Sequence, residues 1–182
     1  MKENTLLAHS LKWGSIIGGI NVIISLLIYL MDVSLFASIK LSVVLFIINI
    51  SLVVYAGLAY RKSLGGFADF KTLLFALFLI QAVCGGIGVM FQVLLYNVLD
   101  PTVPEQITEA SMETTENMLN FFNLPQDDID EALEDAESDI NDSLTTVGSI
   151  KAYFLPGFII YLIIALIIAA IIKKNKPLFE EE

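Results

Sequence analysis

The sequence predicts an all-α polytopic membrane protein with four transmembrane helices and an extracytoplasmic acidic helical hairpin between the third and fourth of them. Of the 182 residues, 56% are hydrophobic, and they gather into four runs. Each run is long enough to cross about 30 Å of hydrocarbon, which takes about 20 helical residues. The acidic residues gather elsewhere: the interval 100–150 holds 14 of the 20 Asp and Glu residues and no Lys, Arg or His.

The four apolar runs cover about residues 13–30, 41–60, 72–98 and 152–172. Each should be an α-helix, because lipid offers no hydrogen-bond partner to an unpaired backbone group. The first run is longer than the apolar part of a secretory signal, and no clear A-x-A cleavage site follows it, so we expect it to be retained. Residues 1–182 are therefore expected to form one membrane domain that carries the insertion 99–150.

The basic residues predict which way the chain crosses the membrane. Lys and Arg near the ends of spans favour the cytoplasmic side. Eight of the ten fall on one side: Lys2, Lys12, Arg61, Lys62, Lys71, Lys173, Lys174 and Lys176. Both termini and the loop 61–71 are thus expected in the cytoplasm, and the insertion outside. Within that loop, Gly65 and Gly66 favour a turn that leads back into the membrane.

The insertion is predicted to contain two helices separated by a break. The first covers about Glu105 to Phe122, and the second follows "NLPQDD", where Pro125 suits a first helical turn. Apolar residues at helical spacing form one stripe on the otherwise acidic second helix: Ile129, Leu133, Ala136, Ile140 and Leu144. We expect this stripe to pack against the apolar side of the first helix, which consists of Ile107, Met118, Phe121 and Phe122.

The acidic surface of the second helix is the candidate contact for a partner or for cations. A solvated acidic face is the ordinary interpretation, and a basic protein partner or divalent binding are the alternatives. The nearest match to a calcium loop, "DINDSLTTVGSI", has Leu144 where the loop needs Gly and Ile150 where it needs Glu. We therefore predict no metal site. The candidate residues are Asp127, Asp128, Asp130, Glu131, Glu134, Asp135 and Asp139.

Each predicted span also has a seam of small or polar residues along one face. Small residues let helix backbones approach closely, and amide side chains hydrogen-bond between helices. Four amides are the candidates within the membrane: Asn21, Asn49, Gln81 and Gln92. Helix packing is their ordinary role, and Asn21 and Asn49 lie at similar depth, where they could touch. A permeation path is the alternative, although the centres of the spans contain no carboxylate, His or Arg that would mark a coupling group.

Enzymatic chemistry has no support in the sequence. It contains no nucleophile elbow, phosphate-binding loop or zinc-ligand spacing, so we predict a non-enzymatic protein without a cofactor. The net charge of −10 argues against nucleic-acid binding. His9 precedes the first predicted span and is expected to be a surface residue. Cys84, inside the third span, is expected to be a small packing residue.

Several motifs together resemble a known family. A basic entry, "YRKSLGGFADFKTLLF", leads into a glycine-containing third span that ends in "LLYNVLDP". An acidic helical segment and a final span with basic residues at its end follow. Over nearly the whole chain this arrangement resembles the domain-of-unknown-function 4199 family of small four-span bacterial membrane proteins. The resemblance implies a multi-pass protein of the bacterial inner membrane, and it implies no activity and no catalytic residue.

Two functions from different classes are compatible with these features. The first is a non-enzymatic scaffold or accessory subunit that presents the acidic hairpin to an envelope partner and associates with itself or with another membrane protein. The alternative is a small transporter or channel, whose acidic hairpin would concentrate cations at its outer mouth. A third is a sensor, in which divalent cations or acid relieve repulsion within the hairpin. Membrane lipid surrounds the protein in every case.

Overall fold

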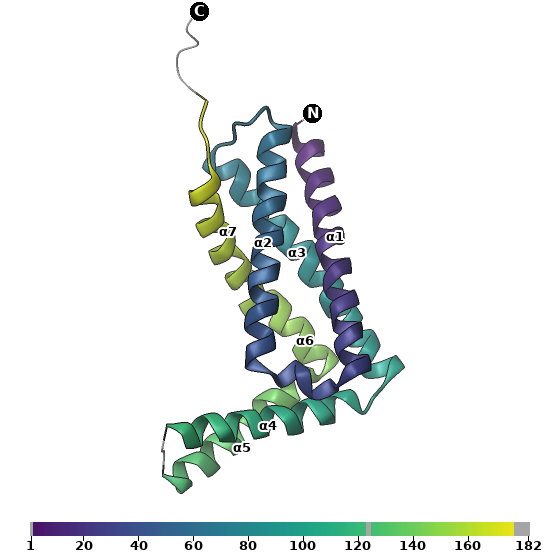
Figure 1. The fold of residues 1–182 in the computed structure, drawn as a ribbon. Helices are drawn as coiled ribbons and strands as arrows, with labels where there is room; N and C mark the ends of the chain where they lie inside the picture. The colour runs from purple at the N-terminus through teal and green to yellow at the C-terminus, as the bar shows by residue number, and fades with distance from the viewer. Residues whose placement is uncertain (1, 123–124, 177–182) are drawn as a thin grey trace, which may run out of the picture.

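The structure, a computed structural model, describes residues 2–122 and 125–176, and these are almost entirely helical. Four helices are long and apolar enough to cross a membrane: Leu6–Met31, Ile39–Ser63, Phe70–Leu99 and Thr146–Ile172. The predicted all-α class with four spans is therefore confirmed, and the chain is a multi-pass membrane protein. Figure 1 shows that the described chain begins and ends at the same end of the bundle.

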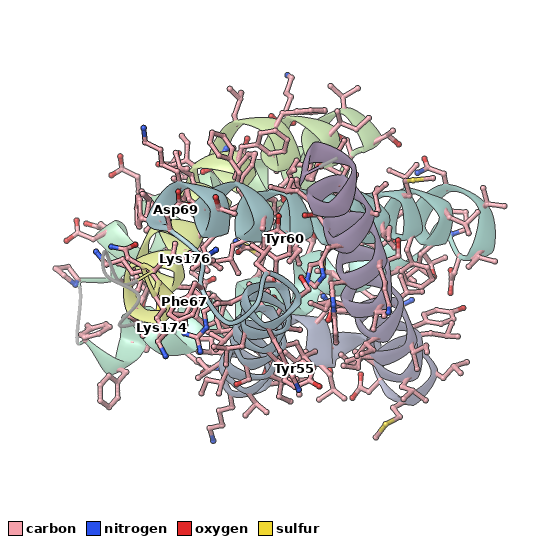
Figure 2. The ribbon with its side chains drawn as sticks, turned by 90° about the horizontal axis from the view of Figure 1, so that it is seen from above. Tyr55, Tyr60, Phe67, Asp69, Lys174 and Lys176 are labelled. Carbon is pink, nitrogen blue, oxygen red and sulfur yellow. The ribbon has the colours of Figure 1, made fainter. Side chains whose placement is uncertain are left out.

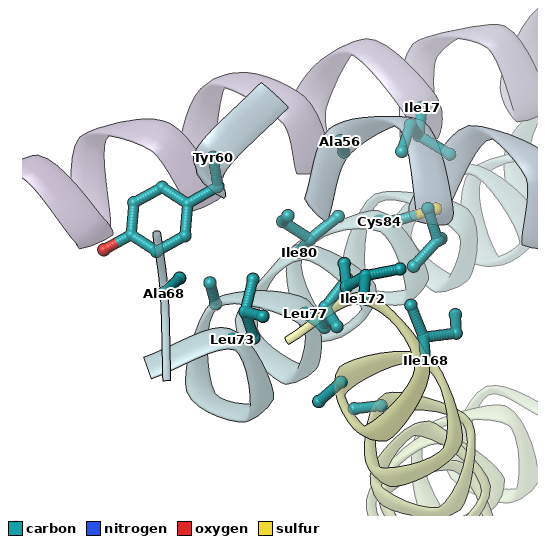
Figure 3. Close-up of a cluster of buried hydrophobic side chains, with 14 residues drawn as sticks. Ile17, Ala56, Tyr60, Ala68, Leu73, Leu77, Ile80, Cys84, Ile168 and Ile172 are labelled. Atoms are coloured by element: carbon teal, nitrogen blue, oxygen red, sulfur yellow. The ribbon is translucent and has the colours of Figure 1, made fainter. Parts of the chain in front are cut away.

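The bundle consists of α1 (Lys2–Met31), α2 (Ile39–Ser63), α3 (Phe70–Leu94) and α7 (Phe158–Ile172). Its central helix is α3, which packs against the other three. Figure 3 shows the buried cluster between these helices, to which all four contribute. Large aliphatic side chains cover the outside of the bundle, as a lipid-facing surface requires.

Glycines bring α1 and α3 close together. A Cβ atom added at Gly14 would lie 2.6 Å from the Cβ of Val83, and one added at Gly18 would lie 2.9 Å from the Cδ1 of Ile87. Real Cβ atoms do not approach other atoms so closely, so a larger residue at Gly14 would push the two helices apart, and one at Gly18 would force the side chain of Ile87 to shift. The small seam predicted for the first span is thus the face on which α3 packs.

The turn between α2 and α3 depends on the predicted glycine pair. Gly65 and Gly66 have φ angles of 82° and 87°, a conformation that costs glycine little because it has no Cβ atom. Their N–H groups hydrogen-bond to the carbonyls of Lys62 and Arg61 and so end α2. The chain then enters α3 at Asp69, whose Oδ1 accepts a hydrogen bond from the Thr72 N–H at 2.8 Å.

The fourth span is built from three consecutive helical segments: α6 (Thr146–Ala152), the π-helix η3 (Tyr153–Gly157) and α7. It begins ahead of the predicted residue 152, because the hydroxyl of Thr145 accepts a hydrogen bond from the Gly148 N–H at 2.9 Å and starts the helix there. The wider π turn contains Pro156, which has no N–H to donate to the preceding turn. The third span also ends in a π-helix, η2 (Leu95–Leu99).

The insertion forms α4 (Val103–Phe121) and α5 (Gln126–Leu144), which pack side by side. Figure 1 shows this α4–α5 pair lying across the end of the bundle that is opposite the described chain ends. Ile129 in the stripe of α5 is only 2% exposed. The packing expected for the end of α4 is wrong, however. The side chains of Met118, Phe121 and Phe122 are 45%, 79% and 65% exposed.

The start of α4, rather than its end, makes the apolar contacts. Val103 and Ile107 are buried against Val33 of the 3-10 helix η1 (Val33–Ala37) and Leu95 of η2. The buried residues of α4, which are Val103, Ile107 and Thr108, all lie in its first two turns. Contact with the spans, as well as contact with α5, therefore decides which face of α4 is buried. The sequence pattern of the insertion alone does not reveal the contact with the spans.

Candidate functional site

Two of the four predicted amide candidates meet at one sulfur atom inside the bundle. The Nδ2 of Asn21 in α1 lies 3.3 Å from the Sγ of Cys84 in α3, and the side chain of Asn49 in α2 also approaches this thiol. Three helices are thus joined at one point. The sequence places both asparagines at similar depth, but it predicts only a packing role for Cys84.

The other two amides join α3 to the fourth span. Gln81 is 5% exposed, and its Nε2 donates hydrogen bonds to the carbonyls of Leu77 at 3.3 Å and Tyr161 at 3.1 Å. The Nε2 of Gln92 donates to the Oγ of Ser149 at 3.1 Å. These bonds connect α3 to the helices on either side of the π turn, so Gln81 and Gln92 both act as links between helices.

His9 also departs from the sequence expectation. It is half-buried: its Nε2 lies 3.1 Å from the carbonyl oxygen of Ala56, and its ring centroid lies 4.8 Å from that of Tyr60. The prediction of a surface residue is wrong because α1 extends to Lys2 and so carries His9 alongside α2. The polar residues before Trp13 had suggested a chain outside the bundle.

All seven residues of the predicted acidic surface lie on α5 and are exposed. We call this set the acidic surface; its members are Asp127, Asp128, Asp130, Glu131, Glu134, Asp135 and Asp139. The Nε2 of Gln126 donates a hydrogen bond to the Oδ1 of Asp130 at 2.9 Å. Within residues 2–122 and 125–176, no group of three His, Cys, Asp or Glu side chains is arranged to hold a metal ion. The carboxylates spread along a helix instead of converging on a point.

An apolar cluster fixes the α4–α5 pair to the bundle. Val33, Leu95, Val103 and Ile107 are all buried, and Leu144 at the end of α5 packs against them. This cluster is separate from the main core between the spans. Since it includes residues from η1, η2 and α4, it holds the insertion against both loops at that end of the bundle.

Hydrogen bonds reinforce this attachment. The Oδ1 of Asp100 accepts hydrogen bonds from the Oγ1 and the N–H of Thr102, at 2.7 and 3.0 Å, and its Oδ2 accepts one from the Oη of Tyr29 at 3.2 Å. These bonds, those from Thr102 first, lower the pKa of Asp100 below its ordinary value. The Oγ1 of Thr108 lies 3.0 Å from the Oδ1 of Asn141 and links α4 to α5.

A comparison with protein families finds a match. A family model described as "Protein of unknown function (DUF4199)" matches residues 12–174, which is most of the chain. The matched range includes all four spans and the whole α4–α5 pair. No curated protein and no solved structure matches the chain.

Proposed function

Since this chain belongs to the DUF4199 family, whose description states no activity, we propose its function from the geometry. We propose that it is a non-enzymatic membrane scaffold or accessory subunit that presents the acidic surface of α5 to a positively charged protein partner. The observation that carries this proposal is the way in which α5 is attached to the bundle. Its acids are exposed along one helix, and that helix is held to the bundle through α4 and the cluster around Ile107.

A fixed acidic helix is suited to recognition. Complementary charge accelerates the encounter of two proteins and selects against partners of the wrong sign. A helix that is already ordered also pays less conformational entropy on binding than a disordered acidic tail would. Such a surface would bind a basic helix or loop, and its binding would weaken as salt screens the charges.

Location and orientation are part of the proposal. The described chain begins and finishes on one side of the bundle, and the excess of basic residues on that side supports a cytoplasmic position for it. The α4–α5 pair lies at the opposite end of the bundle and would then face the outside of the bacterial inner membrane. The partner would accordingly be an envelope protein or the exposed part of another membrane protein.

The transport alternative has less support from the amide side chains. A permeation path would need polar groups that face a common space. Asn21 instead bonds to Cys84, which the side chain of Asn49 also approaches, and Gln81 bonds to backbone carbonyls in α3 and α7. Such bonds are typical of amides that hold membrane helices together.

Paired charge variants test the proposal. The full chain is purified in mild detergent, and co-purifying proteins are identified and quantified in low and high salt. One variant carries Glu131→Gln, Glu134→Gln and Asp135→Asn on α5. The control carries Glu109→Gln, Glu113→Gln and Glu116→Gln on α4. Both remove three exposed charges beyond the first turn of their helix, where the helix dipole contributes little.

We expect a stoichiometric partner that leaves the wild-type protein in high salt, is lost from the α5 variant and stays with the α4 control. A partner that both variants retain would mean that α5 is not the contact. Purification without any partner, together with ion flux in liposomes that Asn49→Leu and Gln81→Leu abolish, would favour the transport alternative.

A further inference from the structure

A cavity of about 990 Å³ opens at the end of the bundle opposite the α4–α5 pair. Its wall is largely apolar and comes from three helices, with Leu6 and Leu7 from α1, Tyr60 from α2, and Phe75 and Leu79 from α3. The volume is at the upper end of the range of about 300–1,000 Å³ that small-molecule sites occupy. This cavity belongs neither to the polar links in the bundle nor to the acidic surface.

The rim of the cavity carries two cations, Lys174 and Lys176. The backbone of Lys174 is fixed by two hydrogen bonds of 2.9 Å with the backbone of Ala68, and its Nζ lies 5.2 Å from the centroid of the Phe67 ring. The segment just before it is held as well, because Nη1 of Arg61 donates to the carbonyl of Ile172 at 2.7 Å. The backbone of Lys174, on this positive rim, is thus held in place by the fold.

The view onto this end, in Figure 2, shows how the polar groups are distributed. Lys174, Lys176, Phe67 and Asp69 gather on one side of the view, with Tyr60 nearer the middle. Asp69 also lines the cavity, and its Oδ1 accepts the Thr72 N–H at 2.8 Å as the cap of α3. Among the described residues that line the cavity, two lysines and one aspartate give the rim an excess of positive charge.

The depth of the cavity indicates what kind of anion would fit. Its lining extends along α3 from Asp69 and Thr72 at the rim to Leu79. At about 1.5 Å per residue, the distance from Asp69 to Leu79 is about 15 Å. That is about half of the 30 Å hydrocarbon thickness, or one leaflet. A polar, positive rim above a leaflet-deep apolar wall matches a phosphate group joined to an acyl chain.

We propose that this cavity binds one anionic phospholipid, with its phosphate at Lys174 and Lys176 and an acyl chain along Leu7, Phe75 and Leu79. The site lies at the boundary between the membrane and water, where lysines attract anionic headgroups. A free phosphate ion would use only the rim and would leave the apolar wall without a ligand. The inference goes beyond the proposed function and does not depend on the acidic surface.

Native mass spectrometry of the full-length protein in neutral detergent tests this site. The protein is titrated with phosphatidylglycerol, phosphatidylcholine and glycerol 1-phosphate, which has the anionic headgroup without acyl chains. The test variant carries Lys174→Gln and Lys176→Gln. The control carries Lys62→Gln and Lys173→Gln, which remove the same charge at the same end of the bundle from exposed lysines that do not line the cavity.

We expect one phosphatidylglycerol per chain and weaker binding of phosphatidylcholine. The test variant should lose about five-fold in phosphatidylglycerol affinity per lysine, and the control should stay within about two-fold of the wild type. Glycerol 1-phosphate should bind far more weakly than phosphatidylglycerol. Equal binding of the two lipids, or an equal loss in both lysine variants, would overturn the proposal. Binding of glycerol 1-phosphate as tight as that of phosphatidylglycerol would also overturn it, in favour of a free phosphate site.

A second pair of variants tests the apolar wall independently of charge. Leu79→Trp would fill the deep end of the cavity, whereas Leu166→Trp adds the same bulk on α7 at a residue outside the cavity lining. Circular dichroism checks that both variants remain helical. We expect only Leu79→Trp to weaken phosphatidylglycerol binding. Equal binding by a folded Leu79→Trp variant would contradict the placement of the acyl chain.

Discussion

Single glycines decide how closely the first and third spans approach. At Gly14, an added Cβ atom would lie 2.6 Å from the Cβ of Val83 and 2.9 Å from the backbone carbonyl oxygen of Ile80. At Gly19 in the same helix, no atom apart from those of the neighbouring turns of α1 itself lies within 4 Å of an added Cβ atom. The two glycines therefore differ in surroundings while sharing the same backbone conformation.

We predict that Gly14→Ala destabilises the bundle by about 1–3 kcal/mol, the usual cost of overpacking a tight contact. Gly19→Ala should be neutral or should stabilise by up to about 1 kcal/mol, because alanine is the better helix former. Unfolding of both variants in mixed micelles, followed by circular dichroism, measures the difference. Equal stability of the two variants would show that the close contact between α1 and α3 is not formed.

Contacts between individual residues are also the features that the sequence predicts least well. The similar depth of Asn21 and Asn49 could be anticipated, but the thiol of Cys84 that both side chains approach could not. A thiol is a weak hydrogen-bonding group, and nothing in the sequence distinguishes Cys84 from an ordinary packing residue. His9 was misplaced for a related reason, since a polar residue near a span end can lie outside the bundle or against a neighbouring helix.

At the scale of elements, the attachment of α4 controls the position of α5. Ile107 is 7% exposed and belongs to the cluster with Val33, Leu95 and Val103, whereas Met118 on the same helix is 45% exposed. Removing the Ile107 side chain leaves a cavity in a contact that joins the insertion to the bundle. Such a truncation of a buried isoleucine costs about 2–5 kcal/mol.

We predict that Ile107→Ala raises amide hydrogen exchange throughout α4 and α5 and leaves exchange in α1 and α3 unchanged. The control, Met118→Ala, should alter neither region, because its side chain is not part of the cluster. Hydrogen exchange detected by mass spectrometry resolves the two regions. A rise that spreads over the spans, or an equal effect of both variants, would mean that this cluster does not serve as a local attachment.

The elements could be predicted from sequence to very different degrees. The spans follow from apolar runs of membrane-crossing length, which is a strong and local signal. The π turn around Pro156 and the start of the fourth span at Thr146 depend on backbone hydrogen bonds that composition does not reveal. The exposed end of α4 was missed because its apolar residues could pack on α5 or point away, and the position of the spans decides between these.

At the scale of the whole molecule, the bundle separates two kinds of surface. One end carries the basic rim of Lys174 and Lys176, and the other carries the α4–α5 pair with its acidic surface. The proposed scaffold function requires the two ends to face opposite sides of the membrane. The candidate acids were identified from sequence, because charge density is a property of composition. The attachment of their helix to the bundle could not be identified from sequence, because it depends on contacts between residues far apart in the chain.

Cysteine labelling in spheroplasts tests this central claim most directly. Cys84, the only native cysteine, is 7% exposed inside the bundle, so the wild type should not react with a membrane-impermeant maleimide. We expect Glu134→Cys on α5 to react from outside, and Lys62→Cys at the opposite end to react only after the membrane is opened. Labelling of both positions from outside, or of Lys62→Cys alone, would contradict a protein that presents its acidic surface outside the cell membrane.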